Sequence, residues 1–154
     1  MSDVKYLLVD GHSVLFSWND LRVLHQRKPR SARDQLIKII QVLHDTGRWR
    51  VTLVFDGKTR GNEVTPTNSM IVAYASEDET ADSLIERTVG AFPHPDRIWV
   101  VTNDRAEAQT VVSLGAHTES TEWLKFEIDA CDELLQNTLK NLNKNVSSNR
   151  IPLS

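Results

Sequence analysis

Short apolar runs alternate with helical segments along most of this chain. Four runs rich in β-branched, leucine and aromatic residues predict strands, over residues 5–9, 50–56, 70–76 and 97–102. The apolar residues in each run follow one another almost without interruption, which is typical of strands covered on both faces and not of an antiparallel sandwich. We therefore expect these strands in the middle of the molecule.

Helices are predicted between the strands. The first begins near Ser31, with Asp34 three residues later, and it ends at Gly47 after a series of leucines and isoleucines at one-face spacing. Two more helices are expected over residues 80–89 and 104–114. The alternation of strand and helix is thus continuous up to residue 114.

A long amphipathic helix is predicted over residues 120–143, and residues 144–154 are expected to form a flexible C-terminal tail. The apolar positions of this helix include Trp123, Phe126, Leu134 and Leu135. Cys131 falls in register with its apolar face, which favours a small core residue over a reactive thiol.

Strands that alternate with helices predict the α/β class, here a three-layer α/β/α fold with a mainly parallel central sheet. A chain of 154 residues that is 40% hydrophobic can bury one core without disulfides. We therefore expect a single domain over residues 1–143.

The charge of the chain is unevenly distributed. The net charge is −3 and the pI is about 5.9, which argues against a protein that coats nucleic acid through bulk positive charge. Residues 22–33 nevertheless hold five basic residues and no acid, so the rest of the chain carries −8. This basic run is interpreted either as a solvated loop with a helix start or as a patch that steers phosphate groups.

The single cysteine cannot form an internal disulfide, and the sequence shows neither a charged-then-apolar leader nor a long uncharged span. We expect a cytoplasmic protein with no membrane partner.

Acidic residues follow the predicted strands at their carboxyl ends. Asp10 follows the first run, Asp56 ends the second, and Asp104 lies two residues after the fourth. Asp82 with Glu79 lies at the start of a helix. Each has an ordinary interpretation as a turn or helix-capping residue. Because the carboxyl ends of parallel strands meet at one edge, the acids together would repel one another unless a cation is bound there. Mg²⁺ or Mn²⁺ prefers such oxygen ligands.

Four segments carry a family resemblance: "LLVDGHSVLFSWNDLR", "VTLVFDGK", "EDETADSLIERTV" and "VVTNDRAEAQTVVSLGA". In order and spacing they resemble the YacP-like NYN domains of the PIN-like nuclease superfamily, over roughly residues 4–130. The resemblance implies a PIN/NYN-like fold and a metal-dependent nuclease, with RNA as substrate and endonucleolytic cleavage. It also implies an association with ribosomes, which one branch of the family has.

Carried over residue by residue, the resemblance implies that Asp10, Asp56, Asp82 and Asp104 form the catalytic cluster. Asp10, Asp82 and Asp104 would bind one or two Mg²⁺ or Mn²⁺ ions, with Glu79 as a further candidate ligand and Asp56 acting through a water molecule. Such ions lower the pKa of a bound water and stabilise charge on the phosphate.

Candidates for substrate binding lie around this cluster. Ser13 stands where the family commonly has asparagine, and its hydroxyl can hold a water or a phosphate oxygen. The basic candidates for the nucleic-acid backbone are Arg22, Arg27, Lys58, Arg60 and Arg105. Trp18 is interpreted either as a base-stacking residue or as a packed one. His12 is interpreted either as a phosphate contact or acid, or as a residue that takes no part in catalysis.

Other functions fit the sequence less well. A phospho-accepting signalling domain needs paired acids after its first strand, and a nucleotide hydrolase of the P-loop kind needs a glycine-rich phosphate motif that is absent from this sequence. The histidines lack the spacing of a zinc site. The alternative that stays open is a catalytically weak PIN-like module that binds RNA or a ribosome without cutting.

Overall fold

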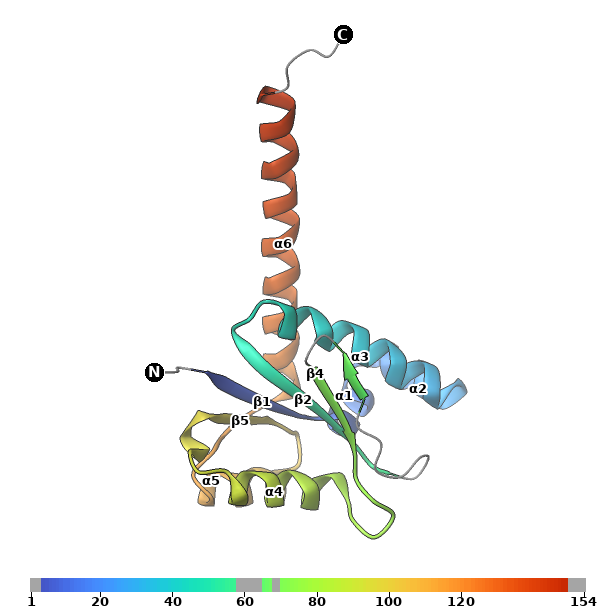
Figure 1. Cartoon of the computed structure of the whole chain (residues 1–154). Coiled ribbons are helices and arrows are strands. Elements are labelled where there is room, and N and C mark those ends of the chain that lie inside the picture. Colours follow the sequence, from blue (N-terminus) through green and yellow to red (C-terminus); the bar gives the residue numbers. More distant parts are fainter. Residues whose placement is uncertain (1–3, 58–64, 68–69, 150–154) are drawn as a thin grey trace.

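The computed structural model describes residues 4–57, 65–67 and 70–149, and their strands form one sheet in the order β3-β4-β2-β1-β5-β6 (Figure 1). Five neighbouring strands are parallel, and β3 pairs antiparallel with β4 at the edge. The strands are β1 (Lys5–Asp10), β2 (Trp49–Phe55), β3 (Thr65–Thr67), β4 (Met70–Tyr74), β5 (Ile98–Val101) and β6 (His117–Glu119). The predicted, mainly parallel sheet is confirmed.

Helices cover both faces of the sheet. One face carries α1 (Gly11–Ser17), α2 (Asn19–Arg27), α3 (Pro29–Asp45) and the start of α6 (Thr121–Asn149). The other carries α4 (Ala81–Ala91) and α5 (Arg105–Ser113), and the short 3-10 helix η1 (Pro95–Arg97) precedes β5. This is the predicted three-layer α/β/α arrangement.

The sheet divides the apolar core into two clusters, and the central strand β1 contributes side chains to both. Leu7 and Val9 pack into the cluster under α3 and α6, and Leu8 packs into the cluster under α4 and α5. Successive side chains of a strand point to opposite faces, so a continuous apolar run is needed where both faces are covered. The run ends at Asp10, which is itself buried.

The order of the strands places a crevice beyond the carboxyl ends of β1 and β5. The chain leaves β1 through α1, α2 and α3 toward β2 on one side, and it leaves β5 through α5 toward β6 on the other side. Neighbouring parallel strands whose connections diverge in this way leave a gap at their ends, where open α/β sheets bind ligands.

Two helices were not predicted. The segment after β1 forms α1 at once, and part of the basic run from residue 22 to residue 33 belongs to α2 and not to a loop. In α2 only Leu21 is fully buried and Leu24 is partly buried, so the apolar signal is short. The basic residues of α2 lie on its exposed face. Too few apolar residues remain to show the helical spacing, so the sequence pattern does not predict this helix.

The last helix is longer than predicted and extends away from the body of the protein (Figure 1). It continues to Asn149 because the first residue that cannot continue a helix is Pro152. Phe126 is 74% exposed and Leu134 is 68% exposed, whereas Trp123 and Cys131 pack against the core. Residues 150–154 of the expected tail lie outside the described residues. None of the described helices is long and apolar enough to cross a membrane.

Candidate metal centre

Asp10 ends β1 and caps α1. Its Oδ1 accepts hydrogen bonds from the backbone N–H groups of His12 and Ser13, at 3.1 and 3.5 Å. The Ser13 hydroxyl donates to the other carboxylate oxygen at 3.1 Å. Asp10 is thus a turn and capping residue, as its ordinary interpretation requires, and these bonds also fix the direction of its carboxylate.

The segment after β5 supplies two acidic residues, Asp104 and Glu107. Asp104 caps α5 by accepting from the backbone N–H groups of Ala106 and Glu107, at 2.9 and 3.1 Å. Glu107 is only 2% exposed, and the buried hydroxyl of Thr102 donates to its Oε2 at 2.6 Å. The side chain of Glu107 is therefore held inside the sheet edge, whereas Asp104 lies at the surface.

The start of α4 supplies the third group, Asp82. The helix is capped by Thr80, and the backbone N–H of Ala81 donates to Asp56 at 2.8 Å. Asp56, which follows β2, thereby ties the end of that strand to the helix that carries Asp82. The other oxygen of Asp56 lies 2.9 Å from Nε2 of His12.

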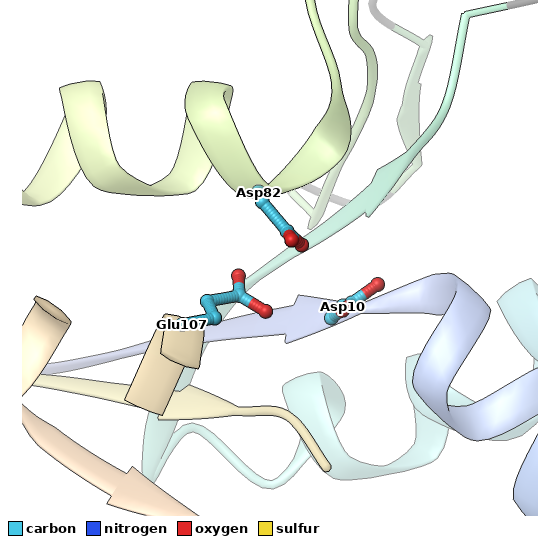
Figure 2. A group of neighbouring side chains, drawn as sticks. All are labelled: Asp10, Asp82 and Glu107. Atoms are coloured by element: carbon cyan, nitrogen blue, oxygen red, sulfur yellow. The ribbon is translucent and has the colours of Figure 1, made fainter. Parts of the chain in front are cut away.

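Asp10, Asp82 and Glu107 lie close together at the end of β1, and the side chains of Asp82 and Glu107 turn toward each other (Figure 2). One oxygen from each lies within 4.8 Å of the other two. The second oxygen of Glu107, Oε1, is buried and has no hydrogen-bond partner among the described residues. A buried oxygen without a donor is costly unless a proton or a cation satisfies it.

Burial and the repulsion among the negative charges of these carboxylates raise the pKa values of Glu107 and Asp82. Burial raises the pKa of Glu107 to about 9, and the Thr102 hydrogen bond opposes the shift. The charges of Asp10 and Asp82, and a hydrogen bond between the Glu107 and Asp82 carboxyl groups, add to it. Burial also raises the pKa of Asp82, although the hydrogen bond with Glu107 opposes this shift, and the charges of Asp10, Asp104 and Asp56 add to it. In the absence of a cation, Glu107 therefore carries a proton at neutral pH.

The donor set suits a hard divalent cation. It consists of carboxylate oxygens from separate elements, one of them buried and lacking a donor. A cation of this kind would take the place of the proton on Glu107 and would remove the repulsion among the acids.

Asp10 and Asp82 line an open pocket of about 420 Å³, a volume large enough for a small-molecule or nucleotide-sized ligand. Glu107 is not among its lining residues and lies buried next to these two. The predicted residues Asp10, Ser13, Asp56, Asp82 and Asp104 all line the pocket.

Glu79 was predicted near the metal, but the structure places its carboxylate elsewhere. It accepts three hydrogen bonds from the guanidinium of Arg87, at 2.8 to 3.1 Å. Arg87 holds it in this ion pair, and it lines a neighbouring pocket.

Glu107 was missed by sequence reasoning. Its spacing from Asp104 matches a capping box, in which a glutamate three residues after the cap bonds back to the backbone. The signal that points to it is its position four residues before Val111, which is fully buried in α5. A glutamate on the inward face of an apolar helix needs a buried partner.

The predicted substrate-binding residues are spread over the surface. Arg105 is exposed in the first turn of α5, Arg27 is exposed on α2, and Arg22 donates to the side chain of Asn19 at 2.7 Å. Lys58 and Arg60 lie outside the described residues.

The structure shows where His12 and Trp18 lie. His12 belongs to α1 and not to an extended segment, so it lines the pocket together with Asp10. Trp18 packs against the core and donates its ring N–H to the backbone oxygen of Thr121 at 3.2 Å, which makes it a structural residue.

Comparison with known proteins gives concordant results. The family model of the YacP-like NYN domain matches residues 7–154. The uncharacterized protein YacP of Bacillus subtilis (strain 168) is 31% identical over 152 residues, which cover 96% of this chain and 89% of that protein.

Two crystal structures of Rae1 (YacP) from Bacillus subtilis are similar to this fold. One is a tryptophan-to-leucine mutant, with a TM-score of 0.80 and 26% identity over 92% of this chain and 86% of that chain. The other has a TM-score of 0.78 and 25% identity over 97% of this chain and 87% of that chain.

Proposed function

The chain belongs to the family of YacP-like NYN domains, and on that basis we propose that it is a metal-dependent endoribonuclease. The family has a nuclease-like fold, and the acids of this chain gather at the edge of the sheet where such folds bind ligands. The observation that carries the proposal is the convergence of Asp10, Asp82 and Glu107 on one point, with a buried carboxylate oxygen left without a donor.

Asp10, Asp82 and Glu107 would hold the cation, with Asp104 beside them. Mg²⁺ or Mn²⁺ fits these ligands, because both prefer carboxylate oxygens and keep positions open for water and substrate phosphate. Once bound, such an ion makes a water molecule more nucleophilic at neutral pH and stabilises the charge that develops on the phosphate.

The other residues of the pocket orient these groups. The Ser13 hydroxyl bonds Asp10, and the backbone N–H of Asn103 donates to that hydroxyl at 3.1 Å, which links the ends of β1 and β5. Asp56 orients the ring of His12 beside the pocket, where the imidazole would act as a general acid toward the leaving oxygen. We therefore assign Asp56 a positioning role.

Exposed positive charges elsewhere on the surface suit a polyanionic substrate. Arg105 begins α5 directly after Asp104, and Arg22 and Arg27 belong to α2. Each would contact the phosphate backbone and contribute affinity that falls as the salt concentration rises.

The test is cleavage of a circular single-stranded RNA, which only an endonuclease can open. The parent protein is expected to linearise the circle with Mg²⁺ or Mn²⁺ and not with EDTA. Asp10→Asn, which retains a capping oxygen, should abolish the reaction, whereas the exposed Asp132→Asn on α6 removes the same charge and should have no effect. Binding without cleavage by the parent would identify an RNA-binding module instead, and cleavage that survives Asp10→Asn would contradict the proposal.

Association with ribosomes is a separate part of the proposal, and it rests on the family alone. Co-sedimentation of the tagged chain with ribosomes through a sucrose gradient tests it, and a chain found only at the top of the gradient would contradict it.

A further inference from the structure

An aromatic ring stands in the wall of the acidic pocket. Phe16 lies on α1 and lines the same pocket as Asp10 and Asp82, and 52% of its surface is exposed. Burying an aromatic side chain is among the larger favourable contributions to folding, but about half of the Phe16 side chain stays in contact with water. The position therefore favours a ligand that covers the ring.

The ring of Phe16 is held from two sides. It stacks on His12, four residues earlier on α1, with ring centroids 5.6 Å apart and an interplanar angle of 15°. The ring of His25 on α2 also contacts it, in an edge-to-face arrangement with ring centroids 5.2 Å apart and an interplanar angle of 68°. His12 is itself bound to Asp56 at 2.9 Å, so Phe16 is supported by a chain of contacts that begins at the end of β2.

We propose that Phe16 is a stacking platform for an unpaired nucleobase of the substrate. The inference rests on the proposed function, because it takes the phosphate of the same strand to lie at the cation that Asp10, Asp82 and Glu107 would hold. A base can stack on a side chain only when it is free of its own neighbours, as in single strands, loops and bulges. The platform would thus make the site select unpaired RNA over duplex.

Trp18 does not offer this surface, although it lies nearby in the sequence. Its ring packs against the core and its N–H is already donated to Thr121. Phe126 is more exposed than Phe16 but lies on α6, beside a different pocket. Phe126 is therefore a matched control for the removal of an exposed phenylalanine.

The experiment measures binding and not cleavage. Fluorescence anisotropy compares a labelled 12-nucleotide oligo(A) strand with a strand of the same length whose central positions lack bases. Ca²⁺ replaces Mg²⁺ so that the strands stay intact, and a gel confirms this after each titration. The proteins are the parent and the variants Phe16→Ala, Phe16→Leu, Phe16→Trp and Phe126→Ala, each checked for an unchanged melting temperature.

Loss of one stacked base weakens binding roughly five- to a hundredfold. Phe16→Ala and Phe16→Leu are expected to show this loss on oligo(A) and little change on the strand that lacks bases, while Phe16→Trp and Phe126→Ala should bind as the parent does. Leucine tests for stacking because it retains apolar contact with His12 and lacks an aromatic face.

Equal affinity of the parent and Phe16→Ala for oligo(A) would overturn the platform. So would an equal loss on both strands, because Phe16 would then act only by supporting His12. In both cases the parent still binds RNA and the proposed function stands. Failure of the parent to bind either strand would instead remove the proposed function, and the platform with it.

Discussion

Replacing Glu107 by glutamine tests the chemistry of the candidate site without RNA. Glutamine has the shape of the protonated glutamic acid, and its side-chain oxygen can accept the hydrogen bond that Thr102 donates at 2.6 Å. The two proteins should thus fold alike. They differ because glutamine has no proton to release on unfolding.

The magnitude follows from the pKa of Glu107, which rises from 4.5 to about 9 on folding. Between these values the folded state binds the proton and the unfolded state does not, so the stability of the parent falls as pH rises, by about 1.4 kcal/mol per pH unit. The stability of Glu107→Gln does not fall in this way, because glutamine does not titrate. From pH 5 to pH 8 the stability of the variant relative to the parent should therefore increase by on the order of 4 kcal/mol.

The assay is thermal or urea unfolding in EDTA at several values between pH 5 and pH 8.5. At pH 8 the variant should melt about 10 °C above the parent, given a shift of 2–4 °C per kcal/mol for a chain of this size. The exposed Glu133→Gln on α6 is the control and should show no pH-dependent difference. A constant difference between Glu107→Gln and the parent at all pH values would mean that Glu107 is ionised in the folded protein and would refute the reasoning.

Other predictions concern the metal, the fold and the ligand set. Because a cation must displace the proton from the buried carboxyl group, the apparent affinity for Mg²⁺ should rise with pH, up to about tenfold per unit between pH 6 and pH 8, as isothermal titration would show. Gly57→Ala should unfold the protein in a melting experiment, because the added Cβ would lie 1.3 Å from the carbonyl oxygen of Ala75. In Gly90→Ala the added Cβ meets nothing within 4 Å, so this variant should stabilise α4 by about 0.5–1 kcal/mol. Glu79→Gln should leave the rate of RNA cleavage unchanged while Asp82→Asn abolishes it, and a rate that falls for Glu79→Gln would return that residue to the ligand set.

The sequence is most informative where one physical rule decides the outcome. A strand covered on both faces must be apolar throughout, so the runs that became β1, β2, β4 and β5 were recognisable without the structure. Parallel strands bring their carboxyl ends to one edge, and this made the common location of Asp10 and Asp104 predictable. The helices α1 and α2 were not predicted because they are short and each buries few residues.

Which acids share a centre was decided only by the tertiary structure. The sequence determined that carboxylates gather at the strand ends, but the direction of each side chain depends on how its helix is rotated against the sheet. On α5 that rotation turns Glu107 inward and leaves Asp104 at the surface, and on α4 it brings Asp82 over β1 (Figure 2). The carboxylate of Glu79 does not join this group, because it forms an ion pair with Arg87, eight residues later in the sequence. The orientations of Asp82 and Glu107 result from packing between elements far apart in the chain, and the local sequence gives only one sign of them, the position of Glu107 four residues before Val111.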